Sequence, residues 1–274
     1  MRIRIGVLPS LVTLGNLVCG FAAIGVTAKA QLFWRAAEPD PSRGFQSFAL
    51  AGGLIFLAMV FDALDGKIAR MADQTTEFGA QLDSLCDMVS FGIAPAYIVF
   101  LEASSRGLFR HPRYAWVCAA LYAICAALRL ARFNVETEPG EDAHRYFHGL
   151  PSPAAAGVVA SLAIFEWSTR EEALWAARCM PYAAILLGGL MISRIRYVHL
   201  LNLFFRERKP FIYLAGLVFA AFAVLILPAF REYVLLAGFG GYVLSGPAVY
   251  GWGAVRRRRA ASDDPSAETN HDSA

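Results

Sequence analysis

The sequence of 274 residues is strongly apolar, with 57% hydrophobic residues, only 17% charged residues and a formal net charge of +3. Average soluble domains carry about 25% charged residues. The composition therefore argues against an ordinary water-soluble enzyme, a disordered chain and a collagen-like repeat, and it predicts that most of the chain lies in a lipid bilayer.

Apolar stretches long enough to cross a bilayer recur along the chain. A membrane-spanning helix needs roughly 20 mainly apolar residues. We predict an all-α fold, a polytopic transmembrane helix bundle of about eight spans. The predicted spans are residues 9–29, 47–65, 79–101, 114–133, 153–168, 173–192, 211–228 and 233–252.

The basic residues predict how the chain is oriented in the membrane. An even number of spans places both chain ends on one side, and most of the 25 Lys and Arg residues fall on that side, among them the run Arg256–Arg259. Because basic loops mark the cytoplasmic face, we predict that both termini are cytoplasmic. A basic membrane protein suits anionic headgroups or phosphorylated substrates, and we expect no nucleic-acid partner.

The domain organisation follows from the same patterns. Residues 1–259 are predicted to form one transmembrane domain. After the arginine run, residues 260–274 carry only acidic charges and show no apolar periodicity. We predict that this acidic tail is disordered.

Four aspartates stand at the ends of the second and third predicted spans: Asp62, Asp65, Asp83 and Asp87. Carboxylates in a membrane are costly and are usually paired or functional. The i,i+3 and i,i+4 spacings put each pair on one face of its helix. Since consecutive helices joined by a short segment are antiparallel neighbours, all four carboxylates are expected to converge at one end of a groove.

Such a cluster predicts a metal site. Four like charges repel strongly at low dielectric, and divalent cations would remove that conflict. Ligand sets made only of oxygen suit Mg²⁺ or Mn²⁺ rather than Zn²⁺, and two such ions would form a phosphoryl-transfer centre. Gly66 and Ala69 keep the helix surface thin beside the acids, and Arg70 supplies a positive charge for a phosphate.

The stretch from Asp62 to Asp87 resembles the signature of the CDP-alcohol phosphatidyltransferases, D-x2-D-G-x2-A-R-x8-G-x3-D-x3-D, at every fixed position. The resemblance implies an integral membrane enzyme in which a second alcohol displaces CMP from a CDP-linked alcohol. It also implies that the four aspartates bind two metal ions and that Asp87 is the general base. The residues expected to bind the CDP-diacylglycerol substrate are Gly66, Ala69, Arg70, Thr76, Thr13 and Asn16.

Further stretches resemble the bacterial branch of this family whose acceptor is L-serine. They are residues 8–20, 83–96, 128–134, 147–151 and 190–197, so that the resemblance covers a core of residues 8–197 and leaves out the extra helices in 211–252. Ser10 departs from the asparagine that this branch usually carries after the proline. The branch implies a multi-pass protein of the inner membrane with its site facing the cytoplasm, CDP-diacylglycerol and L-serine as substrates, and a homodimer.

Serine is a zwitterion, so its site needs a group that binds the carboxylate. Arg129 and Arg132 lie i,i+3 near the end of the fourth predicted span, and either could bind a carboxylate in fork geometry. The full set of candidates for serine binding is Arg129, Arg132, Asn134, Arg194 and Arg196.

Two alternatives stay open. The signature does not by itself choose serine over glycerol phosphate, inositol phosphate or choline as the acceptor. A membrane transporter would also place carboxylates in a helical bundle. Transporters bind near the bilayer midplane and often contain inverted repeats, whereas here the acids cluster at one face and the sequence has no evident repeat.

Overall fold

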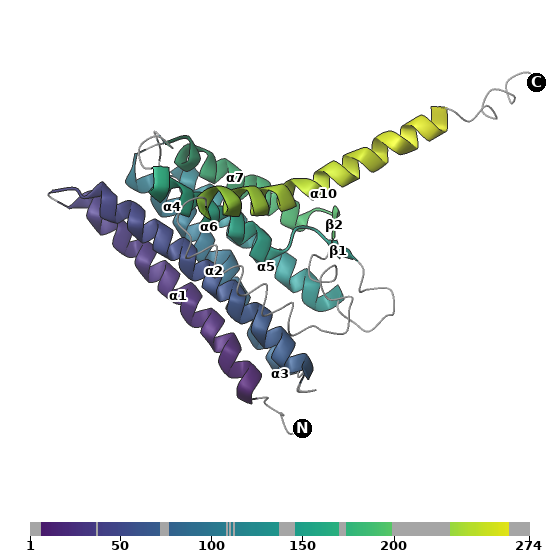
Figure 1. Cartoon of the computed structure of the whole chain (residues 1–274), viewed down its shortest axis with the longest axis horizontal. Helices are drawn as coiled ribbons and strands as arrows, with labels where there is room; N and C mark the ends of the chain where they lie inside the picture. Colours follow the sequence, from purple (N-terminus) through teal and green to yellow (C-terminus); the bar gives the residue numbers. More distant parts are fainter. Residues whose placement is uncertain are drawn as a thin grey trace, which may run out of the picture.

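The computed structural model (Figure 1) describes residues 7–36, 38–71, 77–107, 109, 111, 113–136, 146–169, 174–198 and 231–262. Within these residues the chain is helical apart from two short strands. The elements in chain order are α1 (Val7–Arg35), α2 (Pro41–Met71), α3 (Glu77–Asp87), the π-helical segment η1 (Met88–Ile93), α4 (Ala94–Ser105), α5 (Arg113–Glu136), β1 (Tyr146–His148), α6 (Ser152–Thr169), α7 (Leu174–Ile192), β2 (Arg196–Val198) and α10 (Arg231–Ser262).

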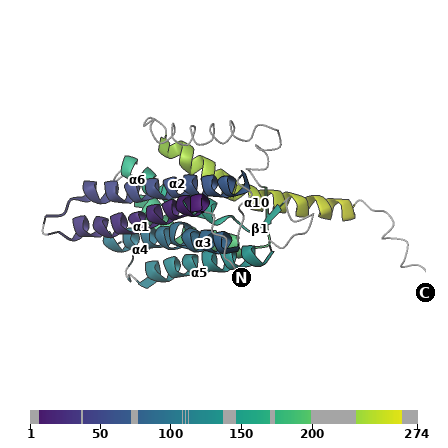
Figure 2. The ribbon, with the colours of Figure 1, turned by 90° about the horizontal axis from the view of Figure 1, so that it is seen from below.

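The helices form an elongated bundle with α6 in its interior. Helix α6 contacts α2, α7 and α10, and nearly all of its residues from Ser152 to Glu166 are buried. Helices α1 and α2 lie side by side along one flank (Figures 1 and 2). The start of α1, the end of α5, both strands and the outer half of α10 lie toward one end of the bundle, which we call the strand end (Figures 1 and 2).

Several helices are long and apolar enough to cross a membrane, and their outward faces carry large apolar side chains such as Phe21 and Trp116. The polytopic helical fold class predicted from the sequence is thereby confirmed. The total of eight spans and the side of the membrane on which the termini lie stay predictions. The candidate spans within the described residues are Ser10–Arg35, Pro41–Gly66, Glu77–Ser105, Arg113–Val135, Trp175–Ile192 and Tyr233–Tyr250.

Two of the predicted spans do not appear among these candidates. Residues 153–168 do form a helix, α6, in the interior of the bundle. A helix enclosed by other helices can still cross the membrane, so this span stays a prediction. Its small side chains, such as Ala155 and Ala160, let the neighbouring helices approach closely. The predicted span 211–228 lies outside the described residues.

The last helix is longer than the sequence predicted. Helix α10 continues through Arg256–Arg259 to Ser262, and so enters the segment for which we expected disorder. Alanine and arginine both favour a helix, which explains why it runs on. Residues 263–274 of the predicted tail lie outside the described residues.

A π-helical segment interrupts the third predicted span. The N–H of Ala94 bonds to the carbonyl of Val89, five residues earlier. Pro95 follows and has no N–H to donate to the preceding turn. The carbonyl of Phe91, four residues before the proline, accepts a hydrogen bond from the Tyr122 hydroxyl of α5 at 3.1 Å instead. Pro95 and Tyr122 together account for the changed helical register after Asp87.

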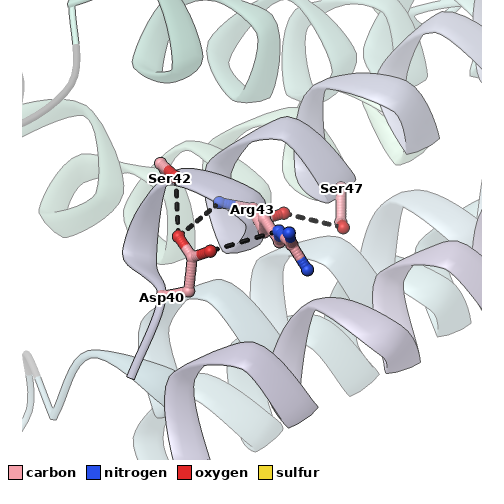
Figure 3. Close-up of polar contacts among 4 residues, drawn as sticks. All are labelled: Asp40, Ser42, Arg43 and Ser47. Carbon is pink, nitrogen blue, oxygen red and sulfur yellow. Dashed lines mark hydrogen bonds and ion pairs between the residues drawn. The ribbon is translucent and has the colours of Figure 1, made fainter. Parts of the chain in front are cut away.

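Asp40 caps the start of α2 (Figure 3). Its carboxylate accepts hydrogen bonds from the Ser42 hydroxyl at 2.6 Å and from the Arg43 amide at 3.3 Å. These bonds, the first above all, hold the pKa of Asp40 below its ordinary value. Pro41 occupies the first helical position, where no N–H is needed. The Ser47 hydroxyl donates to the carbonyl of Arg43, which lies one turn earlier in α2 (Figure 3).

A buried ionic cluster joins four helices at the end of the bundle opposite the strands. Glu102 of α4 and Glu166 of α6 are completely buried. Arg106, directly after α4, places Nη1 3.5 Å from Glu166 Oε1 and also interacts electrostatically with Glu102. Its guanidinium lies over the rings of Trp34 at 5.4 Å and Phe45 at 4.3 Å. One cation therefore connects the ends of α1, α2, α4 and α6.

The two strands join the end of α7 to the start of α6. β1 and β2 pair antiparallel, and the Gly149 amide donates to the Ile195 carbonyl at 2.9 Å. Gly149 has a φ of +87°, and a Cβ there would collide with the Met191 carbonyl. Only glycine combines this conformation with so close an approach. The turn fixes where α6 begins.

We expect Arg106→Met to destabilise the protein, because it leaves two buried carboxylates without their guanidinium. Removing one partner of a buried ion pair costs about 3–5 kcal/mol. The measurement is the thermal unfolding midpoint of the detergent-solubilised protein. Arg43→Met is the matched control, since the Asp40–Arg43 pair is exposed and exposed pairs contribute little. An equal, small change in both variants would contradict this account.

Candidate active site

Aspartates from consecutive helices meet at the strand end of the bundle. Asp62 and Asp65 lie on the last turns of α2, and Asp83 and Asp87 lie on α3. Asp62, Asp83 and Asp87 each offer one carboxylate oxygen, and these three oxygens lie within 4.8 Å of one another. Asp65 lies close enough to interact electrostatically with both Asp62 and Asp83. We call these four residues the aspartate cluster.

The aspartate cluster fits divalent cations. Asp65 and Asp87 are only 4% and 8% exposed. Within the described part of the chain, Oδ2 of Asp65 and Oδ1 of Asp83 are buried and accept no hydrogen bond. Ionised carboxylates at this range repel one another. Divalent cations bound by the aspartate carboxylates would offset this repulsion and would interact with the two carboxylate oxygens that accept no hydrogen bond.

Helix α1 supplies a donor to each pair of acids. Asn16 and Thr13 lie one turn apart on α1, and both are buried. The Asn16 side-chain amide donates to Asp87 Oδ1 at 3.0 Å. The Thr13 side chain hydrogen-bonds to the Asp65 carboxylate. One face of α1 therefore holds an acid of α2 and an acid of α3 in place.

The π-helical segment holds α1 against this site. The Ser90 hydroxyl of η1 donates to the Asn16 carbonyl at 3.0 Å. A Cβ at Gly20 would lie 2.7 Å from the Ser90 Cα, so only glycine permits this approach. π-Helical turns are frequent at functional sites. The predicted span 79–101 implied a regular helix here, although Pro95 in that span signals an interruption.

Among the residues predicted to bind serine, Arg129 lies beside the aspartate cluster. It interacts electrostatically with Asp62 and Asp87. Its Nη1 donates to the Ser152 hydroxyl, at the start of α6, at 2.7 Å. Arg132 lies one turn further along α5 and is partly exposed. Sequence reasoning missed Ser152, although it directly follows the stretch 147–151 that carried part of the resemblance.

The other predicted serine ligands lie around the same end of the bundle. The Asn134 side-chain amide, near the end of α5, donates to the Ser84 hydroxyl at 2.9 Å. Ser84 directly follows Asp83, so this bond ties α5 to the aspartate cluster, and Ser84 is a second residue that sequence reasoning missed. Arg194 is exposed after α7, and Arg196 lies in β2.

The residues predicted to bind the nucleotide continue along α2. Gly66 follows Asp65 directly, and a Cβ there would meet no described atom within 4 Å. The helix surface is therefore open beside the acids, as a bound ligand would require. Ala69 and Arg70 follow on the same helix. Thr76 lies outside the described residues.

Comparison with known proteins agrees with this geometry. The fold and the site define a helical membrane protein with a cluster of carboxylates at one end. Residues 6–191 match the family model of the CDP-alcohol phosphatidyltransferases. The match covers most of the chain, and the protein belongs to this family.

Several curated relatives carry the name CDP-diacylglycerol–serine O-phosphatidyltransferase. That of Methanocaldococcus jannaschii is 36% identical over 177 residues, which are 65% of this chain and 74% of the relative. That of Bacillus subtilis is 30% identical over 192 residues, 70% of this chain and 90% of the relative. That of Mycobacterium tuberculosis is 34% identical over 157 residues, 56% of this chain and 48% of the relative. The chain thus spans about half the length of the relatives from Mycobacterium tuberculosis and Mycobacterium bovis that it matches.

We expect Mn²⁺ to raise the thermal unfolding midpoint of the detergent-solubilised protein. A ligand at a hundred times its Kd stabilises a folded protein by about 2.7 kcal/mol. Asp83→Asn should weaken this stabilisation, because it removes a charged ligand from the aspartate cluster. Asp40→Asn, which removes a carboxylate at the opposite end of the bundle, should leave the stabilisation by Mn²⁺ intact. If Mn²⁺ stabilises Asp83→Asn and the unmodified protein equally, the aspartate cluster is not the site.

Proposed function

We propose that the protein is a CDP-diacylglycerol–serine O-phosphatidyltransferase. It transfers the phosphatidyl group of CDP-diacylglycerol to the hydroxyl of L-serine and releases CMP. The observation that carries this proposal is the aspartate cluster, at the position of the family signature. The names of the relatives support serine as the acceptor.

The reaction exchanges one phosphate ester for another. The serine oxygen attacks the β-phosphorus of CDP-diacylglycerol, and the bond from that phosphorus to the oxygen shared with CMP breaks. Asp87 accepts the proton that the serine hydroxyl loses. Asn16 donates to Asp87 Oδ1 at 3.0 Å and so orients the carboxylate for this task.

Asp62, Asp65, Asp83 and Asp87 would hold two divalent cations, and the all-oxygen ligand set suits Mg²⁺ or Mn²⁺. Bound cations supply charge neutralisation at the phosphate oxygens as the transfer proceeds. Thr13 assists by orienting Asp65 through its hydrogen bond.

The cytidine diphosphate part of the substrate lies along the end of α2. Gly66 and Ala69 let it approach the helix backbone, and Arg70 pairs with a phosphate. Thr13, Asn16 and Thr76 are further candidates for contact with the nucleotide. The acyl chains stay in the bilayer while the headgroup reacts.

Arg129 is the leading candidate for the serine carboxylate, because it lies beside Asp87. A guanidinium binds a carboxylate in a bidentate manner. Asn134 would assist serine binding by holding α3 against α5 through its hydrogen bond to Ser84. Arg132, Arg194 and Arg196 are further candidates at the strand end.

We infer that the strand end faces the cytoplasm, where serine and CMP are soluble. This orientation puts both termini on the cytoplasmic side, in agreement with the distribution of Lys and Arg. The protein would then be a multi-pass protein of the inner membrane, with its active site at the cytoplasmic face. The family resemblance also implies a homodimer.

We expect membranes containing the protein to release CMP from CDP-diacylglycerol when L-serine and Mn²⁺ or Mg²⁺ are supplied. Released CMP is measured with serine, glycerol phosphate, inositol phosphate and choline in parallel. Release that depends on serine alone is the expected result. Release with another alcohol but not with serine would contradict the assignment of the acceptor.

Asp87→Asn provides the inactive control for this assay. Loss of a general base lowers turnover by about 10²–10⁴-fold. Asp40→Asn, at the α1–α2 turn, should keep full activity. Near-normal turnover of Asp87→Asn would remove Asp87 as the base.

A further inference from the structure

A buried serine of the π-helical segment bonds to another helix, which distinguishes it from other buried hydroxyls of the bundle. Thr27 and Ser161 are buried, and each donates to the carbonyl four residues earlier in its own helix, at 2.7 Å and 2.6 Å. Ser90 is completely buried as well, yet its hydroxyl donates to the Asn16 carbonyl of α1 at 3.0 Å. This hydroxyl therefore joins η1 to α1 instead of capping a carbonyl of its own helix.

The bond falls on the turn of α1 that reaches Asp87. In an α-helix, the carbonyl of Asn16 and the amide of Gly20 belong to the same turn. The Cα of Ser90 lies 2.7 Å from the place that a Cβ at Gly20 would occupy, whereas real Cβ atoms stay at least 3.0 Å from such neighbours. Any other residue at position 20 would therefore move α1 away from Ser90. The hydrogen bond and this close approach together fix the backbone of Asn16.

The backbone of Asn16 decides where its side chain lies. The Asn16 Nδ2 donates to Asp87 Oδ1 at 3.0 Å. The Asn16 Oδ1 is buried and accepts no hydrogen bond within the described part of the chain. Because no second hydrogen bond holds the amide, its position against Asp87 depends on the backbone of α1. Two hydrogen bonds thus lead from Ser90 through Asn16 to Asp87.

A further hydrogen bond attaches the same segment to α5. Directly after Ser90, the carbonyl of Phe91 accepts a hydrogen bond from the Tyr122 hydroxyl at 3.1 Å. Both Phe91 and Tyr122 are completely buried. Consecutive residues of η1 are therefore bonded to two different helices, so the position of Ser90 does not depend on its contact with α1 alone.

We propose that Ser90 is a positioning residue for the reaction: it fixes the turn of α1 that carries Asn16 and so keeps the Asp87 carboxylate directed at the acceptor hydroxyl. The inference rests on the proposed function, in which Asp87 accepts the proton of that hydroxyl. A general base has to lie within hydrogen-bond reach of the proton that it takes. The role concerns the catalytic step and not substrate affinity, because the completely buried Ser90 has no surface with which to contact a substrate.

Ser90→Ala tests this role in the CMP-release assay at saturating Mn²⁺. The kcat should fall about three- to tenfold, as loss of one hydrogen bond predicts. The KM for L-serine and the KM for CDP-diacylglycerol should stay unchanged. Ser161→Ala is the matched control, since it removes an equally buried hydroxyl whose bond stays within α6. An unchanged kcat in Ser90→Ala, or an equal loss in Ser161→Ala, would overturn the inference.

Gly20→Ala disturbs the same contact from the side of α1. The added Cβ should push the turn of Asn16 away from Ser90, and a displacement of about 1 Å can lower the rate about 10²-fold. Gly25→Ala is the matched control on the same helix, because a Cβ there would meet no described atom within 4 Å. It should keep the kcat of the unmodified protein. Equal activity of these two variants would overturn the inference.

A kinetic double-mutant cycle tests whether Ser90 acts through Asn16. Ser90→Ala should lower the kcat when Asn16 is present and should have little further effect in the Asn16→Leu background. A general loss of folded protein would instead lower the kcat by the same factor in both backgrounds. Additive effects of the two substitutions would therefore overturn the inference.

The position of the Asn16 amide can also be measured without the reaction, in crystals of Ser90→Ala and of the unmodified protein grown with Mn²⁺. The distance from Asn16 Nδ2 to Asp87 Oδ1 should lie beyond hydrogen-bond reach in Ser90→Ala and within it in the unmodified protein. The same distance in both would overturn the inference. If the unmodified protein releases no CMP with any acceptor, the proposed function fails, and this distance alone decides whether Ser90 positions Asn16.

Discussion

The gathering of four carboxylates, two of them buried, at one end of a membrane bundle is the constraint on which the rest of the structure depends. Ionised groups at such range repel one another, and the low dielectric around them strengthens the repulsion. Hydrogen-bond donors and one cation of the bundle reduce this repulsion. Asn16 donates to Asp87 and Thr13 hydrogen-bonds to Asp65. The Arg129 guanidinium lies beside Asp62 and Asp87. Divalent cations would balance the remaining negative charge, which is the basis of the proposed phosphoryl transfer.

The rest of the bundle holds these groups in register. At the opposite end, Arg106 joins four helices through two buried glutamates and two aromatic rings. Between the two ends, α6 is lined by small residues that let its neighbours pack closely. At the strand end, the turn at Gly149 places Ser152 against Arg129.

The sequence predicted the parts of this arrangement that follow from local periodicity. The i,i+3 and i,i+4 spacings put each pair of carboxylates on one face of its helix. The expected convergence of the two faces is observed for Asp62, Asp83 and Asp87. The enclosed position of α6 could not be predicted, because a buried helix and a lipid-facing helix are equally apolar. The π-helical segment depends on a tertiary bond from Tyr122 as well as on Pro95. The sequence could not distinguish Arg129 from Arg132, because they lie on the same helix one turn apart. The neighbours that set Arg129 apart, Ser152 and the aspartates, lie far away in the sequence.

The most direct measurement is the anomalous diffraction of crystals grown with Mn²⁺, collected at the manganese absorption edge. The account predicts two anomalous peaks, each coordinated by oxygens of Asp62, Asp65, Asp83 or Asp87. Density of this kind would confirm that the carboxylates of the aspartate cluster are balanced by divalent cations. Absence of manganese from the aspartate cluster at saturating concentration, with the four side chains well ordered, would contradict the central claim.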